Sequence, residues 1–202
     1  MTKSIETDIL IIGAGPVGLF TVFEAGLLGL KCHLVDNLDK IGGQCIELYP
    51  EKPIYDIPGV PNQTGKEHID SLLKQIEPFD YEVHLNQRVD KIEQSGDHWI
   101  AETSDGISFK TLNIFIAAGA GSFEPRKPPV ESPDKFLGKG IDYAVRSVDK
   151  YKDKDIVIFG GGDSALDWSV ELANKAKSIK LVHRRDDFRG CLLYTSDAAD
   201  DA

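Results

Sequence analysis

The sequence has few cysteines and no long apolar run. Its 202 residues include three cysteines, Cys32, Cys45 and Cys191, without a C-x-x-C spacing. That pattern excludes a disulfide framework and is typical of a reducing compartment, so we expect a cytoplasmic protein. No segment reaches the ~20 apolar residues of a membrane span, and the polar start of the chain does not resemble a signal peptide. We therefore expect no membrane association.

An excess of positive charge is also missing. The formal net charge is -10 at pH 7, which argues against general binding of nucleic acids. The five histidines are scattered without the spacing of metal ligands, so the sequence predicts no metal site. An apolar content of 41% and a charged content of 28% are typical of a soluble globular protein with one large or two small domains.

The feature that organises the chain is the stretch DILIIGAGPVG at residues 8–18. Its first five residues are expected to form a buried parallel strand, and the G-x-G-x-x-G that follows turns into a helix. Gly13 permits the tight turn, Gly15 lets a pyrophosphate approach the backbone, and Gly18 lets the helix pack closely on the strand. The free N–H groups at the helix N-terminus favour phosphate. Glycine-rich turns are common, so this motif alone is weak evidence for a dinucleotide site.

An acidic residue stands where a dinucleotide site needs one. The expected second strand, residues 31–35, ends at Asp36. An acid at the end of that strand, about 20 residues after the first glycine, can bind the adenosine ribose hydroxyls. The alternative is an ordinary solvated turn aspartate, but its position favours the ribose role.

Hydrophobic periodicity predicts the elements between the two halves of the chain. We expect a functional, turn-rich loop over 37–61 and a helix over 65–76, with a capping box formed by Thr64 and Glu67. The short strands that follow are expected to form an antiparallel meander: 81–85, 89–94, 99–103 and 108–111. The next expected strand, 113–116, leads into another turn that contains glycine, at residues 117–121.

A second dinucleotide unit follows a proline-rich linker. A strand at 155–159 leads into GGGDSA, a G-x-G-x-x-A turn with Ala165 at the close-packing position, and then into a helix and a strand that ends at His183. Arg184 and Arg185 follow where the first unit has an acid. Arginines there can hold a ribose 2′-phosphate through bidentate hydrogen bonds, which predicts NADP(H). The alternative is an exposed basic turn.

Two dinucleotide units imply two dinucleotides. NADPH is a hydride donor, and a flavin is its most economical partner, so the first unit is expected to bind FAD.

The chain resembles the low-molecular-weight thioredoxin reductases, and within that family the thioredoxin-reductase-like ferredoxin–NADP+ reductases. The resemblance rests on GAGPVGLF, GGQCIELYPEKPIYDIPG, GAGSFEPRK, GGGDSALDW and HRRDDFR. It implies an α/β fold with two Rossmann-like dinucleotide-binding domains of the three-layer ββα type, both incomplete at the C-terminal side.

The resemblance also implies residue roles. Gln44 contacts the flavin end of FAD, Tyr49 stacks on the flavin ring, Val89 presents its backbone to adenine, and Phe123 lines the flavin side. The aromatic residues could instead belong to the core, and Val89 could be an ordinary strand residue. The full expected FAD set is Gly13, Gly15, Pro16, Gly18, Asp36, Gly43, Gln44, Tyr49, Val89 and Phe123. The full expected NADPH set is Gly160, Gly162, Asp163, Ser164, His183, Arg184, Arg185 and Arg189.

The sequence departs from the thioredoxin reductases at the position of their redox-active cysteines. Thioredoxin reductases carry Y-C-x-x-C before the second nucleotide strand, whereas this chain has Ala144 and Ser147 at the cysteine positions. Without a dithiol, electrons cannot pass by that route to a protein disulfide. The resemblance then implies FAD-dependent electron transfer between NADPH and ferredoxin or flavodoxin, in a homodimer, with no residue needed for acid–base catalysis. The alternatives are an NADPH-dependent reductase of another acceptor and a non-catalytic FAD/NADPH-binding module.

The resemblance also implies a domain division. We expect an FAD-binding domain over 1–116 without its C-terminal return segment, and a truncated NADPH-binding domain over 117–190. Residues 191–202 do not continue the family pattern, and CLLYTSDAAD resembles a translated sequencing adapter. A natural acidic tail is the alternative. We expect apolar faces to be exposed and FAD to bind this chain weakly.

Overall fold

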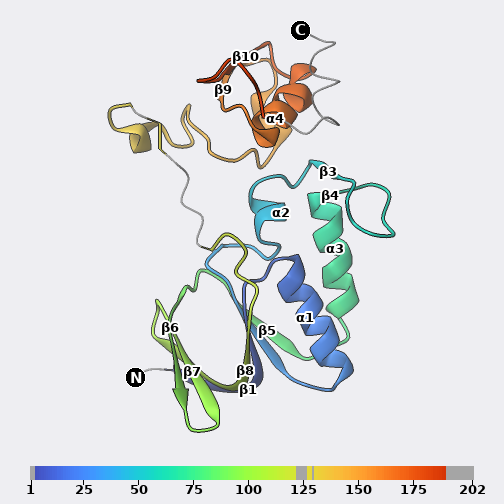
Figure 1. Ribbon diagram of the computed structural model, residues 1–202, viewed down its shortest axis with the longest axis vertical. Coiled ribbons are helices and arrows are strands. Elements are labelled where there is room, and N and C mark those ends of the chain that lie inside the picture. The colour runs from blue at the N-terminus through green and yellow to red at the C-terminus, as the bar shows by residue number, and fades with distance from the viewer. Residues whose placement is uncertain (1–2, 122–126, 129, 190–202) are drawn as a thin grey trace. The chain divides into compact units, whose positions relative to one another are not determined.

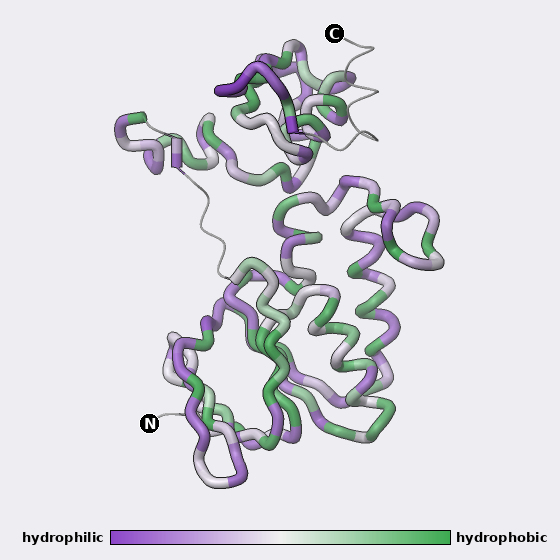
Figure 2. Tube along the Cα trace, in the orientation of Figure 1, coloured by the Kyte–Doolittle hydropathy of each residue, from purple (hydrophilic) through white to green (hydrophobic). Residues whose placement is uncertain are grey.

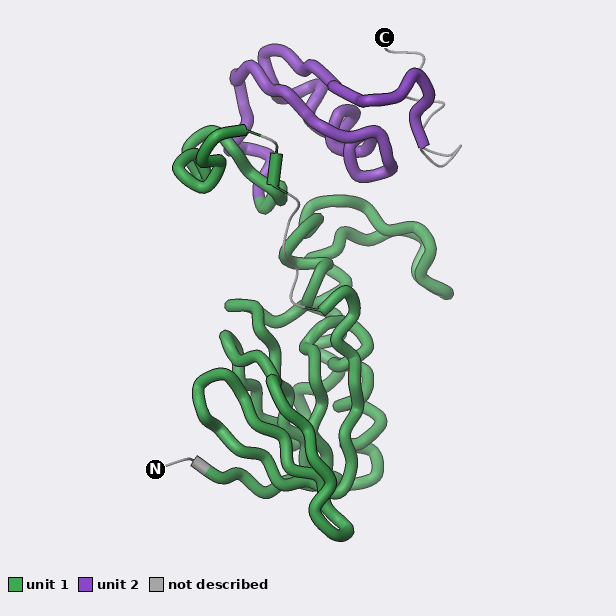
Figure 3. The backbone as a smooth tube through the Cα atoms, turned by 60° about the vertical axis from the view of Figure 1, so that its left-hand side comes forward, with its two compact units in different colours: residues 1–146 green, residues 147–202 purple. Residues whose placement is uncertain are grey.

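The computed structural model describes residues 3–121, 127–128 and 130–189 (Figure 1). Two predictions lie outside these residues, the role of Phe123 and the origin of the tail at 191–202. The chain divides into two compact units, Met1–Arg146 and Ser147–Ala202 (Figure 3). The domain boundaries predicted from the sequence stay predictions, and each unit is described by itself.

The first unit is built on a six-stranded sheet with the strand order β5-β2-β1-β8-β7-β6. Four of its strands run parallel: β1 (Lys3–Ile12), β2 (Cys32–Val35), β5 (Tyr81–His84) and β8 (Ile107–Ile116). The strands β6 (Val89–Ser95) and β7 (His98–Thr103) continue from β8 as an antiparallel meander. Parallel strands bring their carboxyl ends to one edge, where ligands bind in open α/β sheets.

Helices cover one face of the parallel strands. The helices α1 (Pro16–Leu27) and α3 (Gly65–Ile76) lie side by side, and hydrophobic and hydrophilic residues alternate along α3 (Figures 1 and 2). The buried residues between helices and sheet include Ile9, Ile11, Leu19, Val22, Leu34, Ile69 and Ile76. On the opposite face, Leu10 of β1 and Val35 of β2 cluster with Phe109 of β8 and with Ala101 of the meander strand β7. The unit therefore has three layers, as predicted.

The loop predicted at 37–61, together with the residues just after it, contains regular structure. It holds the short helix α2 (Gln44–Glu47) and an antiparallel pair made by β3 (Pro53–Ile54) and β4 (Gln63–Thr64). The predicted capping box is confirmed, because the Thr64 side chain accepts a hydrogen bond from the Glu67 backbone and the Glu67 carboxylate accepts one from Thr64 N–H. That cap fixes the start of α3.

Two strand predictions were wrong in detail. The segments 108–111 and 113–116 form one continuous strand, β8, because its whole length pairs with β1 while only its first half pairs with β7. The strand β5 does not join the meander, because it pairs in parallel with β2 at the edge of the sheet. Local patterns do not specify a strand's neighbour, so the sequence could not make this distinction.

The second unit contains one parallel β-α-β motif. The strand β9 (Asp155–Phe159) is followed by α4 (Asp163–Ala173) and then by β10 (Ser178–Val182), which pairs with β9. Short 3-10 helices, η1 (Pro133–Phe136) in the first unit and η2 (Val148–Tyr151) in the second, lie in the connection. Leu166 and Leu172 of α4 are buried, whereas Val157, Phe159 and Val182 are exposed, with Phe159 76% exposed. Apolar side chains are thus exposed in this unit, as expected. None of the helices in the described part of the chain combines the length and the hydrophobicity that a membrane span needs.

Candidate functional site

The first glycine turn lies where the parallel strands of the larger sheet end. Gly13 has φ +111°, a conformation that side chains rarely adopt, and its N–H donates to the carbonyl of Val35 at 2.8 Å. A Cβ atom at Gly13 would lie 2.3 Å from the carbonyl oxygen of Ala117, which follows β8. Glycine is therefore required here by the close approach of three strand ends.

Gly15 and Gly43 leave an open space between two backbone segments. A Cβ at Gly15 would meet only the Cα of Gly43, at 3.8 Å, while a Cβ at Gly43 would lie 3.0 Å from the Cα of Gly15. Gly15 is also the N-cap of α1, with Pro16 in the first turn and no side-chain cap. The first N–H groups of the helix therefore have no side-chain cap, and the glycines leave the surface beside them open. An anion site at a helix N-terminus requires both features.

Gly18 has a packing role. A Cβ there would lie 1.9 Å from the carbonyl oxygen of Gly13. The close contact between α1 and the turn therefore excludes any side chain. This agrees with the packing role that the G-x-G-x-x-G spacing predicts for its third glycine.

Asp36 lies at the end of β2 and contacts the glycine turn. Its Oδ2 accepts a hydrogen bond from Ala14 N at 2.7 Å, and its Oδ1 accepts one from Leu38 N at 2.9 Å. The carboxylate is partly exposed, so lone pairs remain for ribose hydroxyls. The structure thus brings together Asp36 and the glycine turn, although its ribose role stays a prediction.

The two residues assigned to the flavin end of FAD lie in and just after α2. The exposed Gln44 side chain lies near Gly119, where a Cβ would be 3.5 Å from its Nε2. Tyr49 packs against the core between helices and sheet, and the thiol of Cys45 donates to its hydroxyl at 3.8 Å. Burial raises the pKa of Tyr49 to about 12 and also raises the pKa of Cys45. These contacts support the alternative that Tyr49 is a core aromatic residue, and its flavin role stays a prediction.

Val89 begins β6 and packs against the core below the meander. That contact explains the residue as part of the strand, and its predicted adenine role stays a prediction. Gly119 lies in the glycine-containing turn predicted after residues 113–116, but its proximity to α2 was not predicted, because only the sheet brings the end of β8 to α2.

The second glycine turn repeats the geometry of the first. Gly160 has φ +157°, and its N–H donates to the carbonyl of Val182 at 3.0 Å, as Gly13 does to the last residue of β2. Gly162 is the N-cap of α4, without a side-chain cap, and a Cβ there would meet nothing within 4 Å. Asp163 and Ser164 begin the helix. This turn therefore also has an open helix N-terminus.

The segment after β10 folds back over this turn. Arg189 N–H donates to the carbonyl of Gly161 at 2.7 Å, and the His183 ring stacks on Phe188 at 5.5 Å. A Cβ at Gly161 would lie 2.3 Å from His183 Nδ1, so this glycine, which the motif leaves unspecified, is needed for the contact. His183 Nε2 is buried and has no hydrogen-bond partner among the described residues. The fold-back brings two of the predicted NADPH residues, His183 and Arg189, beside the turn that contains a third, Gly162.

Arg184 and Arg185 lie in the same fold-back. Both are exposed, and neither forms an ion pair with any residue the structure describes. Exposed guanidinium groups in a segment that folds back on the second glycine turn are suited to binding a phosphate. Their role in binding the 2′-phosphate stays a prediction.

Known proteins match this chain over most of its length. The family model described as pyridine nucleotide-disulphide oxidoreductase matches residues 10–190. A protein of Bradyrhizobium sp. (strain BTAi1) named ferredoxin--NADP reductase is 56% identical over 190 residues, which cover 94% of this chain and 56% of the relative. A ferredoxin--NADP reductase of Pelagibacter ubique is 53% identical over 189 residues. The chain spans just over half the length of these curated relatives.

Solved structures give the same result for the fold. Thioredoxin reductase of Lactococcus lactis matches with a TM-score of 0.80 and 26% identity, over 95% of this chain and 60% of that protein. Thioredoxin reductase of T. acidophilum matches with a TM-score of 0.82 over 96% of this chain and 62% of that protein, and at 18% identity it supports the fold alone. The Rossmann-like fold and the family resemblance are confirmed, and the chain belongs to the pyridine nucleotide-disulphide oxidoreductase family.

Proposed function

We propose that this chain provides the FAD-binding and NADPH-binding parts of a cytoplasmic ferredoxin–NADP reductase. The observation that carries the proposal is the repeated glycine turn, followed by an acid in one unit and by arginines in the other. Asp36 suits a ribose with free hydroxyls, and Arg184 with Arg185 suits a ribose that carries a 2′-phosphate. The names of the relatives at 53–56% identity agree with this assignment.

Each unit has a defined part in this function. The N–H groups after Gly15 and Gly162 bind the two pyrophosphates, and Gln44 on α2 and Tyr49 just after it orient the flavin end of FAD. FAD, when bound, supplies the chemistry that links a two-electron hydride donor to a one-electron carrier. The protein's contribution is to bind, to orient and to exclude water.

The lack of a dithiol supports a protein carrier as the electron acceptor. Ala144 and Ser147 occupy the positions of the redox cysteines in thioredoxin reductases, and the free cysteines of the described residues, Cys32 and Cys45, are buried. The remaining route is direct electron transfer from the flavin to ferredoxin or flavodoxin. We further propose that the protein acts as a homodimer, as members of the resembling family commonly do.

A steady-state assay tests the function. The open reading frame that encodes these residues is expressed to its stop codon, and the purified protein is supplied with FAD, NADPH and cytochrome c. We expect cytochrome c reduction to depend on added ferredoxin or flavodoxin. Rapid reduction of quinones or free flavin without a protein carrier would favour a reductase of another acceptor. Failure of NADPH to bleach the flavin absorbance would favour a non-catalytic module.

A further inference from the structure

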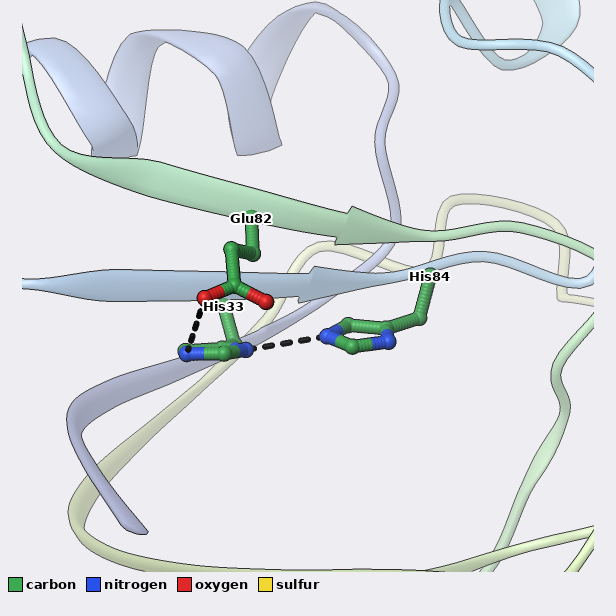
Figure 4. A group of neighbouring side chains, drawn as sticks. All are labelled: His33, Glu82 and His84. Carbon is green, nitrogen blue, oxygen red and sulfur yellow. Dashed lines mark hydrogen bonds and ion pairs between the residues drawn. The ribbon is translucent and has the colours of Figure 1, made fainter. Parts of the chain in front are cut away.

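Two adjacent strands bring together three side chains that can bind a metal ion. His33 lies on β2, and Glu82 and His84 lie on β5, which pairs with β2 in parallel (Figure 4). One donor atom of each residue lies within 4.8 Å of the others. The sequence spacing conceals this group, because β5 becomes a neighbour of β2 only in the folded sheet.

The two histidines are held in place by packing. His33 Nδ1 and His84 Nε2 face each other at 2.9 Å, and the two rings stack with their centroids 5.2 Å apart. Phe109 packs against both rings, with centroid distances of 5.8 Å and 5.0 Å. The His33 side chain is only 2% exposed. The two imidazole nitrogens are therefore held facing each other across 2.9 Å before any ligand binds.

Glu82 supplies an exposed carboxylate at the solvent side. Its side chain is 54% exposed, and its Oε1 lies 3.9 Å from His33 Nε2, which is beyond hydrogen-bond distance. Its other contact is an ion pair with Lys31 at 3.3 Å, which is exposed and therefore weak. A small rotation of this side chain can thus bring its oxygen to a metal at low cost.

We propose that His33, His84 and Glu82 form a site for a divalent transition-metal ion, with Zn²⁺ as the best-suited probe. Imidazole and carboxylate are ligands of Zn²⁺, with bonds of about 2.0–2.2 Å. Tetrahedral bonds of that length place two ligand nitrogens roughly 3.3 Å apart, so the histidine pair has to open by a few tenths of an ångström, and the rings have to turn so that both nitrogens point at the ion. Water completes the coordination on the exposed side.

A bound metal ion would take the place of the proton that lies between His33 Nδ1 and His84 Nε2. In the metal-free protein one of these nitrogens donates a hydrogen bond to the other, since two facing lone pairs would repel. When the metal binds both nitrogens, the donor histidine carries its proton on its other ring nitrogen. Two neutral histidines and a carboxylate then leave one net positive charge on the bound ion, with no redox change.

The site is coupled to the strand ends that carry Asp36. The backbone N–H of Asp36 donates to the carbonyl of His84 at 3.0 Å. A metal that ties β5 to β2 therefore stabilises the edge strand that supports the acid. This inference does not depend on the proposed electron-transfer function.

Calorimetric titration of the whole chain with ZnCl₂ tests the site, in buffer free of chelators. We expect saturable binding of one Zn²⁺ per chain and a rise in Tm. His84→Asn should weaken binding at least tenfold and abolish the rise in Tm. Glu82→Gln changes an exposed side chain, so it should weaken binding without affecting folding. His98→Asn, at the half-buried first residue of β7, is the matched control and should bind as the wild type does.

Two outcomes would overturn the proposal. One is a titration of the folded chain without saturable one-to-one binding. The other is binding that persists unchanged in Glu82→Gln and His84→Asn, which would place the metal elsewhere. Circular dichroism of each variant confirms that the comparison is between folded proteins.

Discussion

The Asp36 carboxylate closes the first glycine turn by accepting a hydrogen bond from the Ala14 backbone N–H, at 2.7 Å. Ala14 is fully buried, so this N–H would otherwise lie without a partner. The second carboxylate oxygen accepts from Leu38 N, which fixes the chain just after β2. An acid usually discussed as a ligand for ribose therefore also holds the phosphate-binding turn in shape.

Asp36→Ala is expected to destabilise the apoprotein. Loss of a charged acceptor from a buried N–H costs about 1–3 kcal/mol of the free energy of unfolding. Asp36→Asn keeps an acceptor oxygen and should cost less. Urea unfolding without FAD measures both, with Asp97→Ala in the β6–β7 turn as the control. Equal stabilities of Asp36→Ala and the control would show that the bond contributes nothing.

Substitutions of Gly15 and Gly18 should have different effects, the first on FAD affinity and the second on the stability of the fold. Gly15 has φ -78° and an open Cβ position, so Gly15→Ala should change the free energy of unfolding by no more than about 1 kcal/mol. Its methyl group should nevertheless lower FAD affinity at least tenfold, because it fills the space for the pyrophosphate. Gly18→Ala places a Cβ against a carbonyl oxygen and should cost about 2–3 kcal/mol without FAD.

Urea unfolding and quenching of flavin fluorescence provide the two measurements. The prediction requires that Gly15→Ala lose FAD affinity while keeping its stability, and that Gly18→Ala lose stability without FAD. If Gly15→Ala bound FAD as tightly as the wild type, the space beside Gly43 would not be the phosphate site.

Local patterns were sufficient for much of this fold. Apolar runs and glycine turns placed β1, α1, β9 and α4, and the Thr64 and Glu67 pair located the start of α3. These elements depend on interactions between residues close in sequence, such as caps and helix periodicity. The arrangement of the glycine turn beside Asp36 also followed from spacing, because a β-α-β unit fixes where its second strand ends.

Long-range pairing could not be predicted in the same way. The edge position of β5 depends on its pairing with β2, and no local signal distinguishes that from pairing within the meander. The proximity of Gln44 to Gly119 and the group of His33, Glu82 and His84 arise from the same long-range arrangement. Residues far apart in the sequence become a site only when the strand order is known.

The buried cysteines should react slowly with alkylating reagents. Burial, assisted by the charge of Asp8, raises the pKa of Cys32 to about 11, and burial raises the pKa of Cys45. Raised pKa values lower the fraction of reactive thiolate at pH 8. Mass spectrometry after iodoacetamide treatment should therefore find both residues labelled much more slowly than free cysteine. Labelling of native protein at the rate of the urea-unfolded control would contradict this.

The capping box should make a measurable contribution to stability. Thr64→Ala removes the acceptor for the Glu67 N–H and is expected to lower the free energy of unfolding by about 1 kcal/mol. Asp70→Ala, which removes an exposed ion pair with Lys66 on the same helix, should cost less than about 0.5 kcal/mol. Urea unfolding of the two variants compares them directly, and a larger loss for Asp70→Ala would contradict the assigned importance of the cap.

The arginines after β10 should determine the preference for NADPH over NADH. The two nucleotides differ only in the 2′-phosphate, so removing Arg184 and Arg185 together should raise the KM for NADPH at least tenfold and change that for NADH less than about twofold. Lys180→Ala removes an exposed charge from β10 itself and controls for a general loss of positive potential. Because neither arginine contacts an acidic side chain within the described residues, the double variant should keep its stability. Equal losses for both nucleotides would show that the arginines bind the shared pyrophosphate or maintain the fold, and the 2′-phosphate would then need another partner.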